Sequence, residues 1–429
     1  MVESGLSEIP SELIHTTVKE FVEHQLNSKQ YTIKCSSASQ SGENNFIGIV
    51  YRVTFGKDDK TENGTTNQGS KLILKVSPQN LARREQFISR PCFLREIYMY
   101  NEVLPFFRQF EESRGVILDD NGFIEYPKCY RTVDKELDEC ILLEDLSVRG
   151  FSIVDRFTED ITADHVRLVM KALGKLHALS FALKDQQPAK FKELTSNLSE
   201  HFIRRNEDLM RGYFAKQAES ASSVLSEEEH GPIIAKVKKL FETSAIDVAA
   251  DCLDLEATGS ASVIAHGDAW QNNTMFRYDQ NGKPIEVSLL DWQVSRQSSP
   301  IIDIVYFVFC CTTKELRDAH YDDFLKVYHE SLSTHIRKLG SDPEKLFPEK
   351  LMQEHFRKFG KFGLVLAAIL LPLLTKDSGK EVDLDGIADG IKTGQVDLDT
   401  NIFMTDSSTR RFNKRLRDVV IDMARLEYI

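Results

Sequence analysis

The chain has 429 residues, of which 28 % are charged and 41 % hydrophobic, an ordinary composition for a globular protein. Its net charge of −12 argues against a nucleic-acid binder, because phosphate backbones are bound by a basic face. A nucleotide site remains compatible with this charge, because magnesium and a few local cations can reverse the field around a phosphate group. The length predicts about two or three domains.

The ends and the apolar runs predict a cytoplasmic protein that makes no membrane contact. Residues 1–10 have no basic segment followed by an apolar one, so no secretory signal is visible. The longest apolar run, residues 362–374, contains Pro372 and is too short to span a bilayer, so we expect a buried helix there. Seven cysteines without a CxxC pair favour a reducing compartment over a disulfide framework.

The first part of the chain reads as a small sheet with a few helices. Apolar spacing predicts helices over residues 10–27 and 90–107, the second ending near Pro105. Alternating or β-branched residues predict strands over 31–35, 48–55, 71–76, 123–130 and 140–144. Residues 56–70 are rich in turn formers and polar residues, which is typical of a solvated hairpin loop.

From Gly150 onward helical periodicity dominates, most clearly over residues 162–183. Residues 263–294 are the only strand-like stretch expected in this half. We therefore expect an α+β, bilobal architecture. A small N-terminal lobe with a mixed antiparallel sheet would span residues 1–147, and a larger, mainly helical C-terminal lobe residues 148–429. The default site of such a protein is the cleft between its lobes.

One motif carries the chemistry. Asp268 and Asn273 follow a short β-branched run, and Asp291 ends the next apolar strand. In phosphoryl transfer, one carboxylate takes the proton of a hydroxyl nucleophile, while an amide and a second carboxylate hold magnesium. Magnesium prefers such oxygen ligands. Each residue alone is better explained as a loop cap, but their joint spacing predicts a phosphotransferase site.

The same chemistry requires a phosphate-binding lysine and an acidic partner upstream. Lys75 lies on a predicted strand, and Glu96 lies on the helix that follows it. As an exposed pair they would stabilise the protein by under about 1 kcal/mol, so their expected role is positioning. The turn at residues 41–46 is a candidate phosphate-covering loop, although an ordinary hairpin turn explains it equally well.

Two further patterns are decoys. Residues 64–71 nearly match a P-loop, but they end in Gly-Ser-Lys and precede a strand, so no phosphate cradle can form. Asp383 and Asp385-Gly386 resemble the start of a calcium loop. Aligning Gly386 with the invariant glycine places Lys392 where a bidentate glutamate must stand, so we expect no calcium site there.

Seven segments of the chain together form a recognisable set: Gly42-Glu43-Asn44, Lys75, Arg95-Glu96, Glu144-Asp145-Leu146, Leu176-His177-Ala178, His266-Gly267-Asp268-Ala269-Trp270 with Asn273, and Asp291-Trp292-Gln293. With this set the chain resembles the insect ecdysteroid-kinase-like family, also called CHK-kinase-like proteins, over about residues 30 to 340. This family is related to choline kinases and aminoglycoside phosphotransferases and has the protein-kinase-like fold. The chain departs from protein kinases in having no Gly-x-Gly-x-x-Gly loop.

The resemblance implies specific roles. Asp268 would be the catalytic base, and Asn273 and Asp291 would be magnesium ligands. ATP would be bound by Lys75, Glu96 and Asn44, and its adenine by backbone groups of the hinge Glu144, Asp145 and Leu146. His266 would brace the catalytic loop, Asp303 would hold the loop backbone, and His177 would be a packed helix residue.

The expected reaction is therefore ATP- and Mg²⁺-dependent phosphorylation of a small-molecule hydroxyl group. The resemblance suggests an ecdysteroid or a hydrophobic xenobiotic alcohol. Only six residues separate Gln293 from Pro300, which leaves no platform for a peptide substrate. A choline or ethanolamine kinase, with Tyr213, Phe214, Phe356 and Phe359 around a cationic head group, is a second reading. A ligand-binding pseudokinase is a third. The sequence indicates no oligomeric state.

Overall fold

The computed structural model describes residues 4–7, 9, 11–38, 47–57, 69–157, 159–200, 203, 207–377, 383–395 and 404–429. The chain forms two compact units, each assembled from three stretches. Unit 1 comprises Met1–Tyr98, Pro127–Phe151 and Gly379–Val396. Unit 2 comprises Met99–Tyr126, Ser152–Ser378 and Asp397–Ile429.

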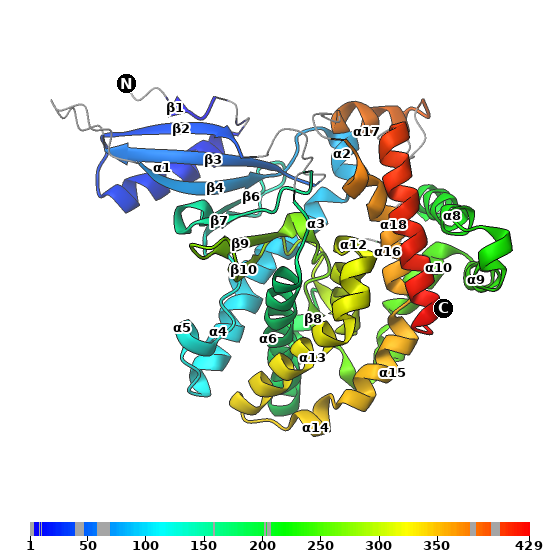
Figure 1. Cartoon of the computed structure of the whole chain (residues 1–429). Helices are drawn as coiled ribbons and strands as arrows, with labels where there is room; N and C mark the ends of the chain where they lie inside the picture. Colours follow the sequence, from blue (N-terminus) through cyan, green and yellow to red (C-terminus); the bar gives the residue numbers. More distant parts are fainter. Residues whose placement is uncertain are drawn as a thin grey trace. The chain divides into compact units, whose positions relative to one another are not determined.

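Unit 1 contains a six-stranded sheet in the order β1-β2-β3-β4-β6-β5 (Figure 1). Its strands are β1 (Ser4–Gly5), β2 (Tyr31–Ser37), β3 (Ile49–Lys57), β4 (Ser70–Val76), β5 (Cys129–Val133) and β6 (Cys140–Glu144). The pair β1–β2 is parallel and the others are antiparallel, so the sheet is mixed as expected. Lys75 on β4 is paired with Ile141 on β6, which places the lysine in the interior of the sheet.

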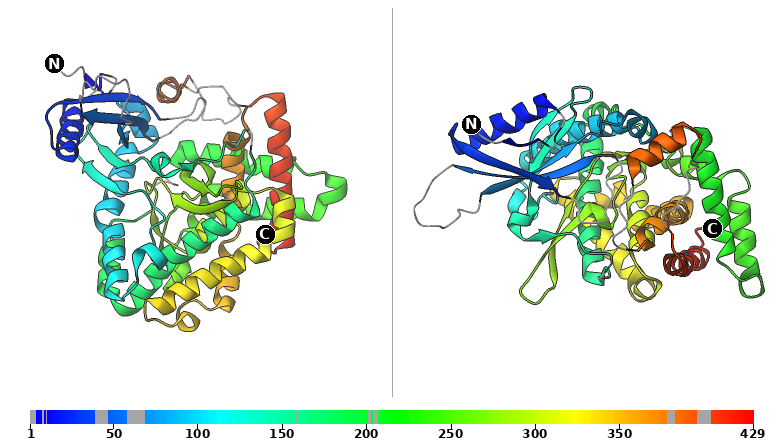
Figure 2. Two further views of the ribbon diagram at one scale, coloured as in Figure 1. Left: turned by 60° about the vertical axis from the view of Figure 1, so that its left-hand side comes forward. Right: turned by 90° about the horizontal axis from the view of Figure 1, so that it is seen from above.

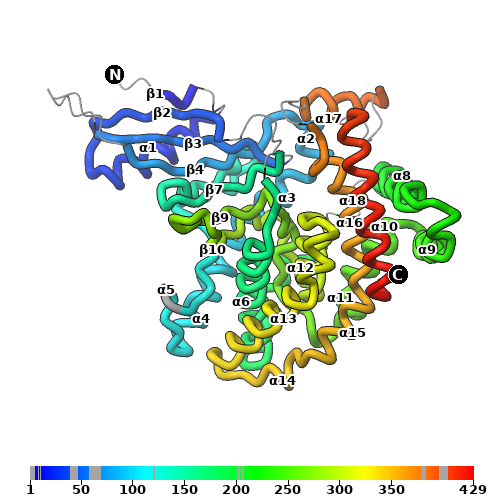
Figure 3. Tube along the Cα trace, viewed as in Figure 1, coloured from blue at the N-terminus to red at the C-terminus, as the bar shows by residue number. Residues whose placement is uncertain are grey.

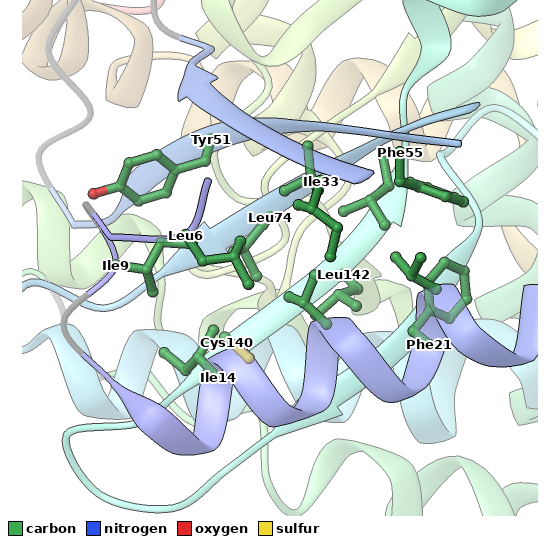
Figure 4. Close-up of a cluster of buried hydrophobic side chains, with 14 of the residues drawn as sticks. Leu6, Ile9, Ile14, Phe21, Ile33, Tyr51, Phe55, Leu74, Cys140 and Leu142 are labelled. Atoms are coloured by element: carbon green, nitrogen blue, oxygen red, sulfur yellow. The ribbon is translucent and has the colours of Figure 1, made fainter. Parts of the chain in front are cut away.

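One face of this sheet is covered by α1 (Glu12–Leu26). The helix starts at Ser11, whose hydroxyl accepts a hydrogen bond from the Ile14 amide at 3.3 Å. Ile14 and Phe21 on the helix and Phe55 on β3 belong to one buried apolar cluster (Figure 4). The period of this helix and the alternation of the strands therefore bring their apolar faces together.

Between β4 and β5 the chain differs from the single helix expected over residues 90–107. Two short helices, α2 (Leu81–Gln86) and α3 (Ser89–Tyr98), are followed by a π-helical turn at Met99–Val103 and a new helix, α4 (Leu104–Ser113). Pro105 lies in the first turn of α4 instead of ending a helix. Proline is tolerated there because the amide that it lacks has no intrahelical partner.

The strand expected over residues 123–130 is also shorter, because β5 begins only at Cys129. The amide of Phe123 donates instead to Oε1 of Glu111, at 2.8 Å, and residues 123–126 belong to unit 2. The observed division is not a single boundary near residue 147, because residues 99–126 belong to unit 2 and residues 379–396 to unit 1.

Unit 2 is mainly helical, and α6 and α13 lie side by side along their length (Figure 2). The short β7 (Phe151–Ser152) spans the unit boundary. The strands of unit 2 are β8 (Val263–Ala265), β9 (Thr274–Tyr278), β10 (Pro284–Leu289) and β11 (Arg296–Ser298). Its helices are α4, α5 (Leu118–Asn121), α6 (Ala163–Gln186), α7 (Pro188–Thr195), α8 (Glu207–Ser223), α9 (Glu227–Leu240), α10 (Ala245–Cys252), α11 (Leu255–Thr258), α12 (Ile301–Cys311), α13 (Lys314–Lys338), α14 (Pro343–Leu346), α15 (Glu349–Phe359), α16 (Phe362–Thr375) and α18 (Asp406–Arg425).

The last part of the chain contains α16, α17 and α18, which are labelled on the tube trace (Figure 3). Helices α16 and α18 pack against each other in unit 2, whereas α17 (Leu384–Lys392) belongs to unit 1. The apolar run expected to be a buried helix is α16, most of whose side chains are buried. Within the described ranges no single helix is long and apolar enough to cross a membrane; one bent pair, 343–359 with 362–375, meets that test by length and composition only.

These elements confirm the expected fold class. The chain is an α+β protein in which one unit carries a mixed, largely antiparallel sheet and the other is larger and mainly helical.

Candidate active site

The catalytic-loop candidate leaves β8 through a turn that only glycine can make. Gly267 has a φ of +84°. A Cβ atom at this position would lie 2.3 Å from the carbonyl oxygen of Val294, so any side chain would collide with the backbone. Glycine allows both the positive φ and the close approach because it has no Cβ atom that would clash. Asp268 then follows at a fixed place on the loop.

A buried carboxylate holds the backbone of this turn. Asp303 on α12 accepts hydrogen bonds from the amides of His266, at 2.7 Å, and Gly267, at 2.8 Å. Nε2 of His177 lies 3.1 Å from the same carboxylate, and its Nδ1 lies 2.9 Å from the Tyr328 hydroxyl. Burial alone raises the pKa of Asp303, but the bonds to His177 and the loop amide outweigh it and lower that pKa. Asp303 and His177 are therefore structural, as expected.

The carboxylate of Asp268 is held at both oxygens. Asn273 donates to Oδ2 at 2.8 Å, and the Tyr306 hydroxyl donates to Oδ1 at 2.6 Å. His266 also faces this loop, because its Nδ1 accepts from the Asp268 amide at 3.3 Å. Burial and the negative charge of Asp291 raise the pKa of Asp268 to about 7, despite the opposing hydrogen bonds. A carboxyl group that titrates near neutrality is suited to general-base catalysis.

Asp291 follows β10 in a strained backbone conformation. Its φ is +66°, in the left-handed region that aspartate tolerates better than most residues but still at some cost. The amide of the preceding Leu290 donates to the carbonyl of Asn273 at 2.8 Å, which ties the end of this strand to the catalytic loop. Backbone strain of this kind often marks functional sites.

The oxygen atoms of Asn273 and Asp291 fit a magnesium ion. The Nδ2 group of Asn273 is used by Asp268, and among the described residues no donor binds its Oδ1. That oxygen is thus an available hard ligand, and the Asp291 carboxylate is chemically of the type that Mg²⁺ prefers. Two protein ligands suffice where phosphate oxygens and water complete the octahedron.

Two neighbours of Asp268 carry no local sequence signal and were not expected. Arg296 is buried; its Nη2 donates to the Gly267 carbonyl at 3.0 Å, and its Nη1 pairs with Glu200. Tyr306 lies on α12, one helical turn after Asp303. The spacing of Asp303 and Tyr306 on one helix could have drawn attention to the tyrosine, because residues three apart share a face.

The two tryptophans of the chain differ in burial. Trp292 is 0 % exposed and packs against His266, with ring centroids 4.5 Å apart. Trp270 is only partly buried. Within the part of the chain that the structure describes, neither indole N–H has a hydrogen-bond partner. Trp270 is therefore the better candidate for contact with a bound ligand.

In unit 1 the expected ion pair is present. Lys75 Nζ lies 2.6 Å from Oε2 of Glu96, and the two residues are 7 % and 1 % exposed. The ammonium group also lies 5.8 Å from the ring centroid of Phe93. Such a buried pair fixes the lysine side chain in one direction. Asn44 and the rest of the turn at residues 41–46 lie outside the described residues.

The proposed hinge, residues 144–146, begins at the last residue of β6. Asp145 is buried; its carboxylate accepts from Arg52 Nε at 2.7 Å and from the Ser147 amide at 3.0 Å. Burial raises the pKa of Asp145, but the bonds to Ser147 and Arg52 outweigh it and lower that pKa. Leu146 is buried, and the Glu144 amide donates to the Lys128 carbonyl at 2.9 Å. The Asp145 side chain is thus committed to the fold, which leaves backbone groups for any ligand.

The four aromatic residues considered for a cationic head group are all core residues. The exposed fraction is 7 % or less for every member of the set Tyr213, Phe214, Phe356 and Phe359. Tyr213 and Phe214 pack edge to face, and Phe356 stacks on Tyr428. They are packed against each other and their helices, and do not form an open aromatic cage.

Phosphoryl transfer depends on positioned charges more than on covalent chemistry. The chain belongs to the ecdysteroid kinase-like family, whose model matches residues 42–341. No curated protein matches the sequence.

Among solved structures, the chain is similar to two GDP complexes of aminoglycoside 2′-phosphotransferase-IIIa. The complex of a point mutant is 11 % identical, with a TM-score of 0.43, and the match covers 96 % of this chain and 98 % of that one. The wild-type complex is 10 % identical, with a TM-score of 0.42, over 96 % and 99 % of the two chains. The family assignment follows from the sequence match.

Proposed function

We propose that this protein is an ATP- and Mg²⁺-dependent small-molecule kinase that phosphorylates a hydroxyl group. The observation that carries the proposal is the fixed orientation of the Asp268 carboxylate together with its raised pKa. Its carboxylate is oriented at both oxygens by Asn273 and Tyr306, and its pKa of about 7 suits a base that takes the proton of an alcohol.

The other residues take roles that follow from their chemistry. Asn273 Oδ1 and the Asp291 carboxylate would hold magnesium, which supplies positive charge to the nucleotide phosphates when bound. Lys75, held by Glu96 at 2.6 Å, would bind phosphate oxygens, and Asn44 would contribute from the loop that covers them. Backbone groups at Glu144, Asp145 and Leu146 would bind the adenine. Catalysis would then come from positioning and fixed charge.

We infer that the acceptor is an ecdysteroid or a hydrophobic xenobiotic alcohol. Family membership supports this substrate class, and the packed aromatic residues give no support to a choline-type head-group site. The seven cysteines form no CxxC pair in the sequence, which supports a reducing, cytoplasmic location.

The test is a screen with labelled ATP, magnesium and separate acceptors that include an ecdysteroid, other hydrophobic alcohols and choline. We expect label transfer to a hydroxyl compound, and Asp268→Asn is expected to lower kcat by more than about 100-fold while ATP still binds. Undiminished turnover in Asp268→Asn would rule out the base assignment. Binding of acceptors with no ATP consumption by the wild-type protein would indicate a pseudokinase.

A further inference from the structure

A helix from the C-terminal tail docks on the segment that separates Lys75 from Glu96. Helix α17 packs against α2, about 300 residues earlier in the chain, and both belong to unit 1 (Figure 1). Asn80, the cap of α2, accepts from the Arg83 amide at 2.8 Å and donates to Asp389 at 3.1 Å. Lys392 pairs with Glu85 at 3.2 Å. The residues matched by the family model end at 341, so α17 lies beyond them.

The central contact of this interface is the ion pair of Arg83 with Asp385. Nη1 of Arg83 lies 3.2 Å from Oδ1 of Asp385. The same guanidinium reaches the carbonyl of Gly48 with its Nη2, at a longer 3.5 Å. A planar guanidinium can bind two acceptors at once in a fixed geometry. Arg83 therefore connects the tail carboxylate to the backbone at the start of β3.

Gly48 in turn lies directly against Lys75. A Cβ atom on Gly48 would lie 3.3 Å from Cε of Lys75 and 3.4 Å from its Cγ. The aliphatic stem of the lysine is thus confined by this stretch of backbone, and its ammonium group by Glu96 at 2.6 Å. A shift of the backbone at Gly48 would change the space available to the lysine stem.

The two arginines in the middle of α2 pair with carboxylates that differ in exposure. Arg84 donates to Glu139 at 2.8 Å; Glu139 is 0 % exposed and also accepts a hydrogen bond from Arg90. The Arg83 side chain is 9 % exposed, but the side chain of Asp385, with which it pairs, is 52 % exposed. Water screens a half-exposed carboxylate more than a buried one, so the contact of Arg83 with α17 is the weaker of these two ion pairs.

We propose that α17 tunes nucleotide affinity: its Asp385 holds Arg83 against the Gly48 carbonyl and thereby keeps Lys75 directed toward the nucleotide phosphates. The proposal rests on the proposed function, because it assigns Lys75 to phosphate binding. Asp385 and Arg83 are positioning residues in this scheme, since they act on Lys75 through the backbone at Gly48. Undocking of α17 lowers affinity for ATP with little effect on the chemical step.

The test measures the Kd for Mg-ATP, by calorimetry, and kcat at saturating ATP in the full-length protein. Asp385→Arg is expected to raise the Kd about three- to tenfold, which corresponds to about 0.7 to 1.4 kcal/mol, and to leave kcat within about twofold. Asp385→Glu, which keeps the charge, is expected to bind like the wild type. Asp406→Arg, the same reversal on an exposed site of α18, is the matched control and is expected to change neither value.

A double-mutant cycle distinguishes an effect transmitted through the Arg83–Asp385 contact from a general loss of stability. If the two residues act through one contact, Asp385→Asn adds nothing to the increase in Kd caused by Arg83→Gln. Additive effects, or a wild-type Kd in Asp385→Arg, overturn the proposal. Should Asp385→Arg fail to fold, Asp385→Asn alone decides in the same way. A wild-type protein that does not bind Mg-ATP overturns the proposed function itself, a result distinct from unaffected variants of a protein that binds.

Discussion

The hydroxyl of Tyr306 donates a hydrogen bond to Oδ1 of Asp268 across 2.6 Å. Because Asn273 holds the other oxygen at 2.8 Å, the carboxylate has little freedom to rotate. The bond joins the loop after β8 to α12, whose Asp303 also holds the loop backbone. One helix therefore holds both the backbone that leads to the candidate base and the side chain of that base.

Replacing Tyr306 by phenylalanine removes only the hydroxyl. The hydrogen bond from Tyr306 lowers the pKa of Asp268, so its loss is expected to raise that pKa further above its ordinary value. Since the base acts when deprotonated, the acid limb of the kcat profile should move to higher pH, with kcat near pH 7 reduced about tenfold. The KM for ATP should stay close to wild type. An unmoved acid limb would argue against this hydrogen bond in the working enzyme.

Gly267→Ala is expected to destabilise the protein by more than about 2 kcal/mol, because a φ of +84° combines with a Cβ placed 2.3 Å from the Val294 carbonyl. Gly282→Ala is the matched control. It has a similar φ of +76°, but nothing lies within 4 Å of a Cβ there, so only the conformational cost of about 1 kcal/mol is expected. Urea unfolding measures both values. Equal losses in the two variants would contradict the predicted backbone collision.

Two buried histidines predict a loss of stability in mild acid. Burial lowers the pKa of both His165 and His355 from 6.5 to about 4. Between these values the unfolded chain binds more protons than the folded one, so stability is complete above about pH 6.5 and falls as the pH drops toward 4. The urea midpoint should therefore be lower at pH 5 than at pH 7.5. His165→Gln should reduce this difference, and an unchanged difference would rule out His165 as a source.

The tryptophans offer an optical test of ligand binding. Saturating Mg-ATP is expected to change the intrinsic emission. The change should persist in Trp292→Phe, since Trp292 is 0 % exposed, and should largely vanish in Trp270→Phe, which removes the partly exposed indole of the catalytic loop. Calorimetry on the same variants verifies that each still binds the nucleotide. An undiminished emission change in Trp270→Phe would instead identify Trp292 as the residue that senses the nucleotide.

The sequence predicted those parts of the fold and site that depend on neighbours in the chain. Strand β6 and helix α6 lie where alternation and helical spacing placed them, and Asp268 and Asn273 share one loop. The Lys75–Glu96 pair was found because the chemistry required a partner for the lysine. Tyr306, which bonds Asp268, and Arg296, which bonds the Gly267 carbonyl, were missed because they reach the loop from elements later in the chain and have no local motif.

Other differences arose where tertiary contacts override a local preference. Pro105 predicted the end of a helix, but it starts one, because the chain first passes through a π-helical turn. The apolar stretch after Phe123 predicted a strand, but a carboxylate of Glu111 captures the first amide. Asp383, which resembles the start of a calcium loop in the sequence, caps α17 by accepting from the Gly386 amide at 2.9 Å.

The three-stretch composition of each unit has a practical consequence for dissecting the protein. A fragment that ends near residue 151 would carry residues 99–126, which belong to the other unit, and would lack the tail stretch 379–396. It would present α2 without the carboxylates of Asp385 and Asp389. Neither unit corresponds to one continuous stretch of the coding sequence, so a truncation from the start that passes residue 98, or one from the end that passes residue 397, removes pieces from both units.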